Sequence, residues 1–197
     1  AEYLTKAIDD SLSRLRTDRI DLWQIHRPDV LTHPQEIART IEDAHKAGKI
    51  RAFGVSNFTQ AQITALAQFS AVPIVSTQPE LSPLRIDTIE NGELDQAIAM
   101  DLAVMAWSPL GGGRIGEPQD VREQNVAAAL SGVAAAHNVS RTAAAYSWIM
   151  AHPARPIPIV GSQNPARIIE AADAFKIQWT RADWYSVLVA ARGVPLP

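Results

Sequence analysis

The 197-residue sequence contains no cysteine, and this absence removes several classes of protein from consideration. A disulfide scaffold, a cysteine-ligated zinc site and a thiol nucleophile all require cysteine side chains. A chain without cysteine fits the reducing cytoplasm, so we expect a cytoplasmic protein. The five histidines show no spacing typical of metal ligands, and we expect no metal site.

The sequence also lacks a basic excess and a long apolar run. Its formal net charge is −3 and no cluster of Lys and Arg is present, which argues against a nucleic-acid groove. No apolar stretch approaches the roughly 20 residues of a membrane span. The opening AEYLTKAIDD has neither the basic nor the apolar region of a signal peptide. We therefore expect neither a nucleic-acid nor a membrane partner.

What is present is an alternation of helical and strand-like segments in one globular domain over residues 1–197. Leu4, Ile8, Leu12 and Leu15 have the spacing of an amphipathic helix. Thr32 with Gln35, and Thr59 with Gln62, have the spacing of a capping box at the start of a helix. Apolar strand-like segments lie between the helical ones, at 22–26, 50–58, 72–80, 102–110 and 156–162. Near-continuous apolar strands separated by helices predict a parallel sheet that is covered on both faces.

Two α/β architectures can hold such a sheet: a doubly wound open sheet and a (β/α)8 TIM barrel. A doubly wound nucleotide-binding domain carries G-x-G-x-x-G after its first strand, and this chain does not. The stretch GGGRIG at 111–116 has glycines at other offsets and follows a late strand. Polar residues instead follow every strand, and in a barrel these strand ends meet on one face. The pattern therefore favours the barrel.

The barrel is expected to be incomplete in this chain. Five strand-like segments are present where a barrel needs eight, and typical barrels have about 250 residues. The five segments fit strands 4–8 with their helices, so the first three strands would lie upstream of Ala1. Because an open barrel leaves unpaired strand edges, we expect that the missing N-terminal strands or another chain must close it.

The stretch DLWQIHRPD places His26 at the end of a strand that Pro28 terminates. A histidine in an apolar strand is ordinarily a core residue bonded to a backbone carbonyl. Its position at a carboxyl strand end, among other polar strand ends, favours a functional role. A neutral imidazole there can donate a hydrogen bond to a substrate oxygen or exchange a proton near neutral pH.

Three further strand ends carry groups suited to recognition. Thr59, directly after GVSNF, takes the helix-capping role. The Asn57 amide is therefore expected to recognise another amide. Gln78 ends the next strand before Pro79 terminates it. Trp107 precedes Ser108 at the fourth strand end, where its ring serves either as core packing or as a flat wall for a planar ligand.

The stretch VGSQNPARIIE at 160–170 is the strongest anion site in the sequence. Asn164 and Pro165 are typical of a helix start, where free backbone N–H groups can bind phosphate. Ser162 and Arg167 add a hydroxyl and a positive charge. The stretch GGGR at 111–114 serves either as a flexible turn or as a loop whose backbone approaches a pyrophosphate, with Arg114 supplying charge.

Together these segments resemble the aldo-keto reductases over essentially the whole chain. The markers are DLWQIHRPD, AGKIRAFGVSNF, STQPELSPL, MAWSPLGGGR and IPIVGSQNPARIIE, in that order. HRPD and AWSPLGGGR are most similar to bacterial members of the family. The resemblance implies a (β/α)8 barrel that binds NADP(H) in extended form, and reduction of aldehydes or ketones to alcohols by hydride transfer.

The resemblance also implies roles for individual residues. His26 matches the active-site histidine that orients the carbonyl of a small-molecule substrate, and Trp107 matches the ring that stacks on the nicotinamide. The groups that hold the nicotinamide carboxamide match Ser56, Asn57 and Gln78. The pyrophosphate loop matches Ser108, Leu110, Gly112 and Arg114. The adenosine end matches Gly161, Ser162, Gln163, Arg167 and Glu170, with Ser162 and Arg167 at the 2′-phosphate. Ala171 stands where the family often has Asn.

The proton donor of the family is a Tyr, assisted by a Lys and an Asp, and all three lie upstream of the histidine strand. Tyr3, Tyr146 and Tyr185 match none of its motifs, so we expect the catalytic Tyr, Lys and Asp upstream of Ala1. The 197-residue chain alone is therefore expected to be inactive.

Two alternatives remain open. One is a non-catalytic NADP(H)-binding barrel that acts as a sensor or subunit. The other is a glycosidase with Glu80 and Asp29 as its two carboxylates, although Asp29 lies past a proline in a loop.

Overall fold

The structure is a computed structural model that describes residues 1–196. The chain divides into two compact units, of which the first comprises Ala1–Gln78 and Ala99–Ala103. The second comprises Pro79–Ile98 and the described chain from Val104 onward. No helix among the described residues combines the length and apolarity needed to cross a membrane. The expectation of a single domain over residues 1–197 stays a prediction.

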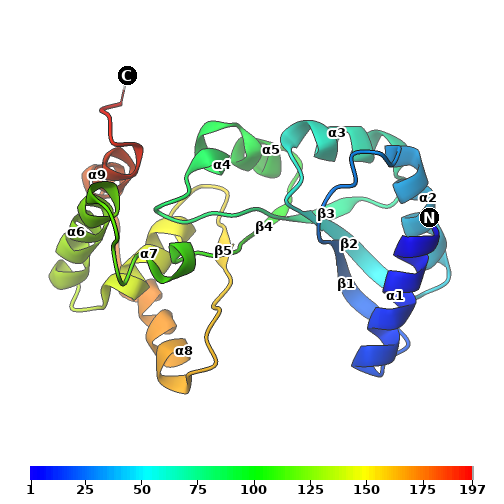
Figure 1. Cartoon of the computed structure of the whole chain (residues 1–197), viewed down its shortest axis with the longest axis horizontal. Helices are drawn as coiled ribbons and strands as arrows, with labels where there is room; N and C mark the ends of the chain where they lie inside the picture. Colours follow the sequence, from blue (N-terminus) through cyan, green and yellow to red (C-terminus); the bar gives the residue numbers. More distant parts are fainter. Residues whose placement is uncertain (197) are drawn as a thin grey trace. The chain divides into compact units, whose positions relative to one another are not determined.

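The first unit is a three-stranded parallel sheet with helices between the strands. Its elements are α1 (Glu2–Leu15), β1 (Ile20–Ile25), α2 (Pro34–Lys46), β2 (Ile50–Ser56), α3 (Gln60–Phe69) and β3 (Ile74–Gln78). In the register, Ile25 lies opposite Val55 and Ser56 lies opposite Gln78. Helix α2 lies against β2 and contacts both α1 and α3 (Figure 1). Because the strands are parallel and in this register, their carboxyl ends form one edge.

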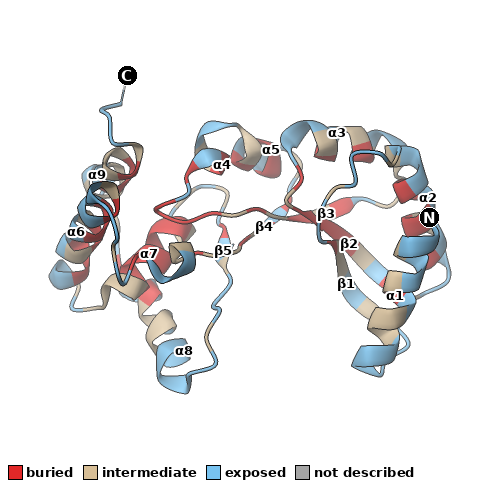
Figure 2. Ribbon diagram, in the orientation of Figure 1, coloured by how far each residue is buried: buried red, intermediate tan, exposed pale blue. Residues whose placement is uncertain are grey.

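Strand β2 is the buried centre of this unit. Most of β2 is buried (Figure 2). Phe53 and Val55 are completely inaccessible, and Ile41 on α2 and Ile63 on α3 are nearly so. Burying each such side chain contributes about 1.5–3 kcal/mol to the free energy of unfolding. Between Phe53 and Val55 lies Gly54, where a Cβ atom would stand only 1.9 Å from the Ser76 side-chain oxygen. The close approach of β2 and β3 therefore requires glycine at this position.

In the second unit β4 (Ala103–Ala106) pairs in parallel with β5 (Ile157–Pro158). The first residue of β4 is counted with the first unit. Before β4 are the short helices α4 (Asp87–Glu90) and α5 (Glu93–Ala99). The last residue of α5, Ala99, is counted with the first unit. After β4 follow η1 (Gly111–Gly113), α6 (Val121–Ala136) and α7 (Arg141–Met150). After β5 follow α8 (Pro165–Ala171), η2 (Ala172–Lys176) and α9 (Arg181–Arg192). Helix α6 packs along α9 and α7 (Figure 1).

The core of the second unit is held by a pair of tryptophans. The rings of Trp148 on α7 and Trp184 on α9 stack with centroids 4.9 Å apart and planes 12° from parallel. Each indole N–H donates to the other residue's backbone carbonyl, both at 3.0 Å. Helices α7 and α9 are therefore joined by a stacked contact and two reciprocal hydrogen bonds.

The structure confirms the order of helices and strands and corrects four details. The predicted Thr32–Gln35 capping box is wrong: His33 is the N-cap of α2, its Nδ1 accepting from the Gln35 N–H at 3.2 Å. Strand β1 is partly exposed, because among the described strands it pairs only with β2. Helix α4 was not expected. Strand β5 is shorter than predicted, since Pro156 and Pro158 have no N–H for a strand ladder.

Candidate functional site

The carboxyl ends of β1, β2 and β3 are tied together by polar residues. The Asn57 side-chain N–H donates to the His26 carbonyl at 2.9 Å and to the Ser56 hydroxyl oxygen at 3.1 Å. The Ser56 hydroxyl donates to the Gln78 carbonyl at 2.8 Å, and the Asn57 backbone N–H donates to the same carbonyl at 3.2 Å. The structure therefore brings together the four residues predicted at these strand ends.

Asn57 has a specific backbone role in this cluster. Its φ of 60° lies in the left-handed region, which Asn tolerates better than most residues. The sequence suggested an amide reserved for recognition, yet the structure uses its N–H groups to join two strand ends. Asn57 therefore primarily joins the ends of β1 and β2, and any recognition of a ligand by its amide is an additional role.

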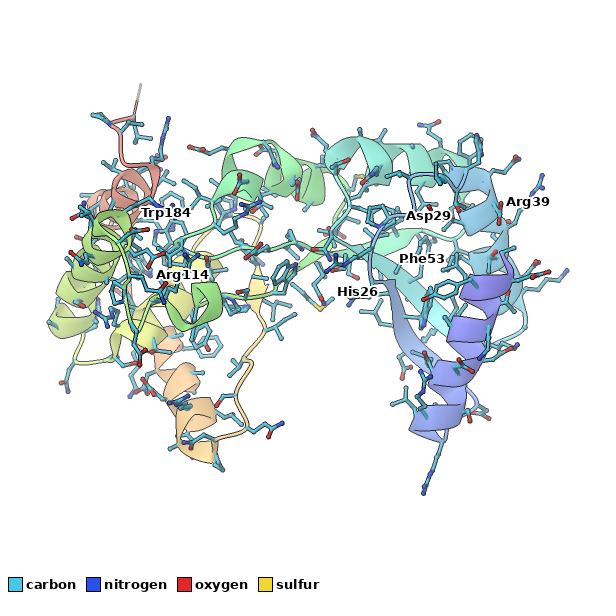
Figure 3. The ribbon with its side chains drawn as sticks, in the orientation of Figure 1. His26, Asp29, Arg39, Phe53, Arg114 and Trp184 are labelled. Carbon is cyan, nitrogen blue, oxygen red and sulfur yellow. The ribbon has the colours of Figure 1, made fainter. Side chains whose placement is uncertain are left out.

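His26 is the first residue beyond β1 and its side chain is exposed. The turn that follows is fixed by Asp29, which accepts from the Thr32 hydroxyl at 2.6 Å and from the Leu31 N–H at 3.0 Å. These two bonds, the hydroxyl first, lower the pKa of the Asp29 carboxyl. These bonds fix the path of the chain after the strand. His26 stands at the start of this turn, where its side chain is accessible (Figure 3).

In the second unit, Trp107 directly follows β4 and its backbone is held in place. Its backbone N–H donates to the Pro79 carbonyl at 3.1 Å, and its carbonyl accepts from the Leu81 N–H at 3.3 Å. The next residue, Ser108, has a left-handed φ of 51° and turns the chain into the glycine loop. Its hydroxyl oxygen accepts from the Gly112 N–H at 3.2 Å. Trp107 is half-buried, so part of its ring is accessible.

The glycine loop after Ser108 is open above its backbone. Gly112 and Gly113 have φ values of 66° and 93°, and a Cβ atom at either position would meet no heavy atom within 4 Å. The Leu110 carbonyl accepts from the Gly113 N–H at 3.1 Å, which closes the turn. A backbone that is exposed and free of Cβ atoms can approach a phosphate closely.

Arg114 closes this loop through an ion pair. Its Nη1 lies 2.7 Å from Glu123 Oε1, and its Nε donates to the Gly111 carbonyl at 3.3 Å. The Glu123 side chain is completely buried, and its other oxygen accepts from the Gln119 N–H at 2.8 Å. Arg114 itself is exposed over nearly half of its side chain (Figure 3). The guanidinium is therefore anchored on one side and accessible on the other.

The loop after β5 forms the second half of this unit's candidate site. The Asn164 side-chain oxygen Oδ1 accepts from the Ala166 N–H at 2.9 Å, which confirms the predicted N-cap of α8. The Ser162 hydroxyl oxygen accepts from the Asn164 N–H at 3.1 Å, so Ser162 shapes the turn. Gly161, Gln163 and Arg167 are exposed, and Glu170 is half-buried.

Strand pairing places these two loops at one edge of the second unit. Ala106 lies opposite Pro158, and the Ile159 N–H donates to the Ala106 carbonyl at 2.9 Å. Trp107 and the 161–164 turn thus both follow the carboxyl end of the pair. The predicted residues form two groups, one at the β1–β3 edge and one at the β4–β5 edge.

Sequence reasoning missed Glu123. The sequence did contain a signal for a helix start here, because an acidic residue three positions after a capping Asp is typical of one. In the structure, Asp120 caps α6 by accepting from the Glu123 N–H at 2.8 Å. What the pattern could not indicate is that this carboxylate is buried and paired with Arg114, because that depends on how α6 packs.

The fold and both edges define a member of a known class. The model of the aldo/keto reductase family matches residues 1–188, and the chain belongs to this family. The chain is 64% identical over 197 residues to the 6-dehydroglucose reductase of Novosphingobium aromaticivorans, covering 100% of this chain and 65% of that protein. It is 36% identical over 200 residues to the oxidoreductase YdhF of Escherichia coli, again covering 65% of the relative.

A solved structure gives the same result for the fold. The glycerol dehydrogenase AKR11B4 of Gluconobacter oxydans matches with a TM-score of 0.86 at 28% sequence identity, over 98% of this chain and 65% of that chain. This match confirms the expected fold class, an α/β chain that forms part of a (β/α)8 TIM barrel. The chain spans about 65% of the length of the relatives that it matches.

Proposed function

We propose that this chain is the cofactor-binding part of an NADP(H)-dependent oxidoreductase that reduces aldehydes or ketones to alcohols. The observation that carries the proposal is the hydrogen-bonded cluster of His26, Ser56, Asn57 and Gln78 at the carboxyl edge of β1–β3. In parallel α/β folds, ligands bind at this edge of the sheet. An accessible imidazole beside hydroxyl and amide groups suits a carbonyl substrate and a carboxamide.

The groups present fit a nicotinamide dinucleotide. In the first unit, the half-buried Gln78 carries an amide of the kind that pairs with a carboxamide, beside Ser56 and Asn57, whose polar groups hold the strand ends. In the second unit, the half-buried Trp107 carries a ring face. The open backbone at Gly112 and the anchored Arg114 suit a pyrophosphate. When bound, the cofactor would supply the hydride that reduces the carbonyl carbon.

The role of His26 follows from the charge that develops in such a reduction. Negative charge appears on the carbonyl oxygen as the hydride reaches the carbon, and a hydrogen-bond donor must stabilise it. His26 is accessible, and its backbone carbonyl is held by Asn57, so its backbone has a fixed place on the edge from which the ring can reach a ligand. We assign it the task of orienting the substrate carbonyl.

The proton donor is assigned outside this chain. Tyr3 and Tyr185 lie on α1 and α9, and Tyr146 is buried on α7, so none stands at a strand end. The proposal therefore places the catalytic Tyr, with its Lys and Asp, in the part of the natural protein that the 65% coverage leaves out.

The proposed cofactor is NADP(H) rather than NAD(H). Arg167 is exposed on α8, and in the part of the chain that the structure describes no carboxylate forms an ion pair with it. Together with the Ser162 hydroxyl, it offers a cationic site suited to a 2′-phosphate. Gly161, Gln163 and Glu170 would line the adenosine end.

The proposed substrate is an aldehyde on a small sugar. The relative that is 64% identical over the whole chain is named 6-dehydroglucose reductase. We therefore propose 6-dehydroglucose, whose carbonyl at C6 becomes the hydroxymethyl group of glucose.

The test measures NADPH oxidation by the natural full-length protein with 6-dehydroglucose and with simple aldehydes. His26→Gln should lower kcat/KM by about 100-fold, while His45→Gln, which changes an exposed histidine on α2, should leave it unchanged. If the protein binds NADPH but reduces no aldehyde or ketone, the proposed reductase activity is wrong. That result would support the alternative, a non-catalytic NADP(H)-binding barrel.

A further inference from the structure

The second unit contains a cavity that the proposed reaction does not use. It has a volume of about 670 Å³ and lies between α7, η2 and α9. Small-molecule sites commonly have volumes of about 300–1,000 Å³. Its walls carry four aromatic residues and one histidine, namely Phe175, Trp179, Trp184, Tyr185 and His152. We call this the aromatic cavity.

The aromatic cavity lies at the opposite end of the second unit from the candidate site. Met150 and His152 line it, and they stand at the carboxyl end of α7 and in the chain that leads into β5. Ser162 and Asn164 follow the carboxyl end of the same strand. Because a strand separates the two places, a ligand in the aromatic cavity would not occupy the proposed cofactor site.

The tryptophans of this cavity have already used their polar groups within the protein. Trp184 donates its indole N–H to the Trp148 carbonyl at 3.0 Å, and Trp179 donates its own to the Ser147 hydroxyl oxygen at 3.0 Å. Their rings are thereby fixed, and neither indole N–H remains to serve as a donor in the cavity. Phe175 adds a side chain that is 79% exposed. Such walls favour a flat aromatic ligand.

Polar recognition in the cavity falls to Arg181 and His152. The Arg181 guanidinium carbon lies 5.7 Å from the centroid of the Tyr185 ring, which positions the cation at the rim. Among the described residues no carboxylate forms an ion pair with Arg181. The ring of His152 accepts from the Ala154 N–H at 3.2 Å through Nδ1, which leaves Nε2 as its donor.

From this arrangement we infer that the aromatic cavity is a second ligand site that binds a small aromatic carboxylate. The ring of the ligand would lie among Phe175, Trp179 and Trp184, and its carboxylate would pair with the Arg181 guanidinium at the rim. His152 would supply a further hydrogen bond. Burial lowers the pKa of His152, with Asp95 acting in the opposite direction, and this favours the uncharged ring. This site is independent of the proposed reductase activity.

The test is calorimetric titration of the natural full-length protein with naphthoate, in the absence and in the presence of saturating NADPH. Naphthoate should bind saturably in both. Naphthalenemethanol, which keeps the ring and lacks the charge, and cyclohexanecarboxylate, which keeps the charge and lacks the flat ring, should both bind at least tenfold more weakly.

Two variants locate the site. Arg181→Gln should weaken naphthoate binding by about tenfold or more, and Phe175→Ala by about threefold to tenfold. Both side chains are exposed, so neither change threatens the core. Arg51→Gln, which removes an exposed arginine of β2 in the first unit, is the matched control and should bind as the unaltered protein does. The inference is overturned if naphthoate does not bind, if NADPH displaces it, or if Arg181→Gln binds it normally.

Discussion

Arg114 and Glu123 form an ion pair of 2.7 Å in which the carboxylate is completely buried and the guanidinium is exposed over nearly half of its side chain. The pair links the glycine loop after β4 to the first turn of α6. An arginine assigned to a phosphate is thus held by protein charge before any ligand arrives.

The first prediction concerns this pair. Arg114→Gln leaves a buried carboxylate without its cation and should lower the free energy of unfolding by about 1–3 kcal/mol, less than for a fully buried pair because water reaches the guanidinium. Adding Glu123→Gln should recover part of that loss, and urea denaturation of the unaltered protein, the two single variants and the double variant measures the coupling. Additive losses in the double variant would show that the two charges do not interact.

The same pair should affect cofactor binding. With Glu123→Gln, Arg114 keeps its charge and loses its anchor, so we expect KM for NADPH to rise about threefold to tenfold while kcat changes little. A fall in kcat with an unchanged KM would contradict the positioning role.

Asn57 combines a left-handed backbone with bonds to two strand ends. Asn57→Gly keeps the φ of 60° available and removes only the side-chain bonds, whereas Asn57→Ala adds backbone strain. Asn57→Ala should therefore be less stable than Asn57→Gly by about 1 kcal/mol, measured by thermal unfolding. Both should bind NADPH more weakly. Equal stability of the two variants would show that the backbone conformation carries no cost.

The contact between Gly54 and Ser76 predicts a sharp difference between two glycines. In Gly54→Ala the new Cβ would stand 1.9 Å from the Ser76 hydroxyl oxygen and 2.8 Å from its carbonyl oxygen, so we expect a loss of about 1–3 kcal/mol. Gly132→Ala is the matched control. On α6 its new Cβ meets nothing within 4 Å, and removing a helical glycine should stabilise the protein by about 0.5–1 kcal/mol. Similar denaturation midpoints for the two variants would contradict this account.

His152 gives the protein a pH dependence of defined sign. Burial lowers its pKa in the folded chain below the ordinary value of 6.5, so the unfolded chain binds this proton more readily. Its contribution to stability is therefore complete above 6.5 and is lost as the pH falls through that value toward the folded pKa. His152→Gln should flatten the fall in melting temperature over this range, and His45→Gln should not. Parallel profiles for His152→Gln and the unaltered protein would exclude the histidine as the cause.

Much of this fold could be read from the sequence because its strands are short, apolar and bounded by turn residues. The grouping of His26, Asn57 and Gln78 followed from one fact, namely that parallel strands share a carboxyl edge. What could not be read depends on competition between neighbouring groups. The sequence pattern predicted Thr32 as the N-cap of α2, but the Thr32 hydroxyl donates to Asp29 instead. His33 is the N-cap in its place.

The burial of a polar side chain is a second feature that the sequence could not predict. Nothing in the local pattern around Glu123 distinguishes an exposed capping carboxylate from one that is buried against Arg114. The answer depends on how α6 packs in the folded unit, where its main partner, α9, is distant in sequence. The cavity beside Trp184 has the same origin, since its walls come from α4, α7, η2 and α9 and from the segments next to them.

The stacked indoles of Trp148 and Trp184 belong wholly to the second unit, whereas Trp23 is the tryptophan of β1 in the first. Nearly parallel rings at 4.9 Å form a contact between α7 and α9, so we expect the circular dichroism that arises from this contact to disappear when the two helices separate. The protein therefore contains its own reporter of whether its two units unfold in one cooperative step or in succession.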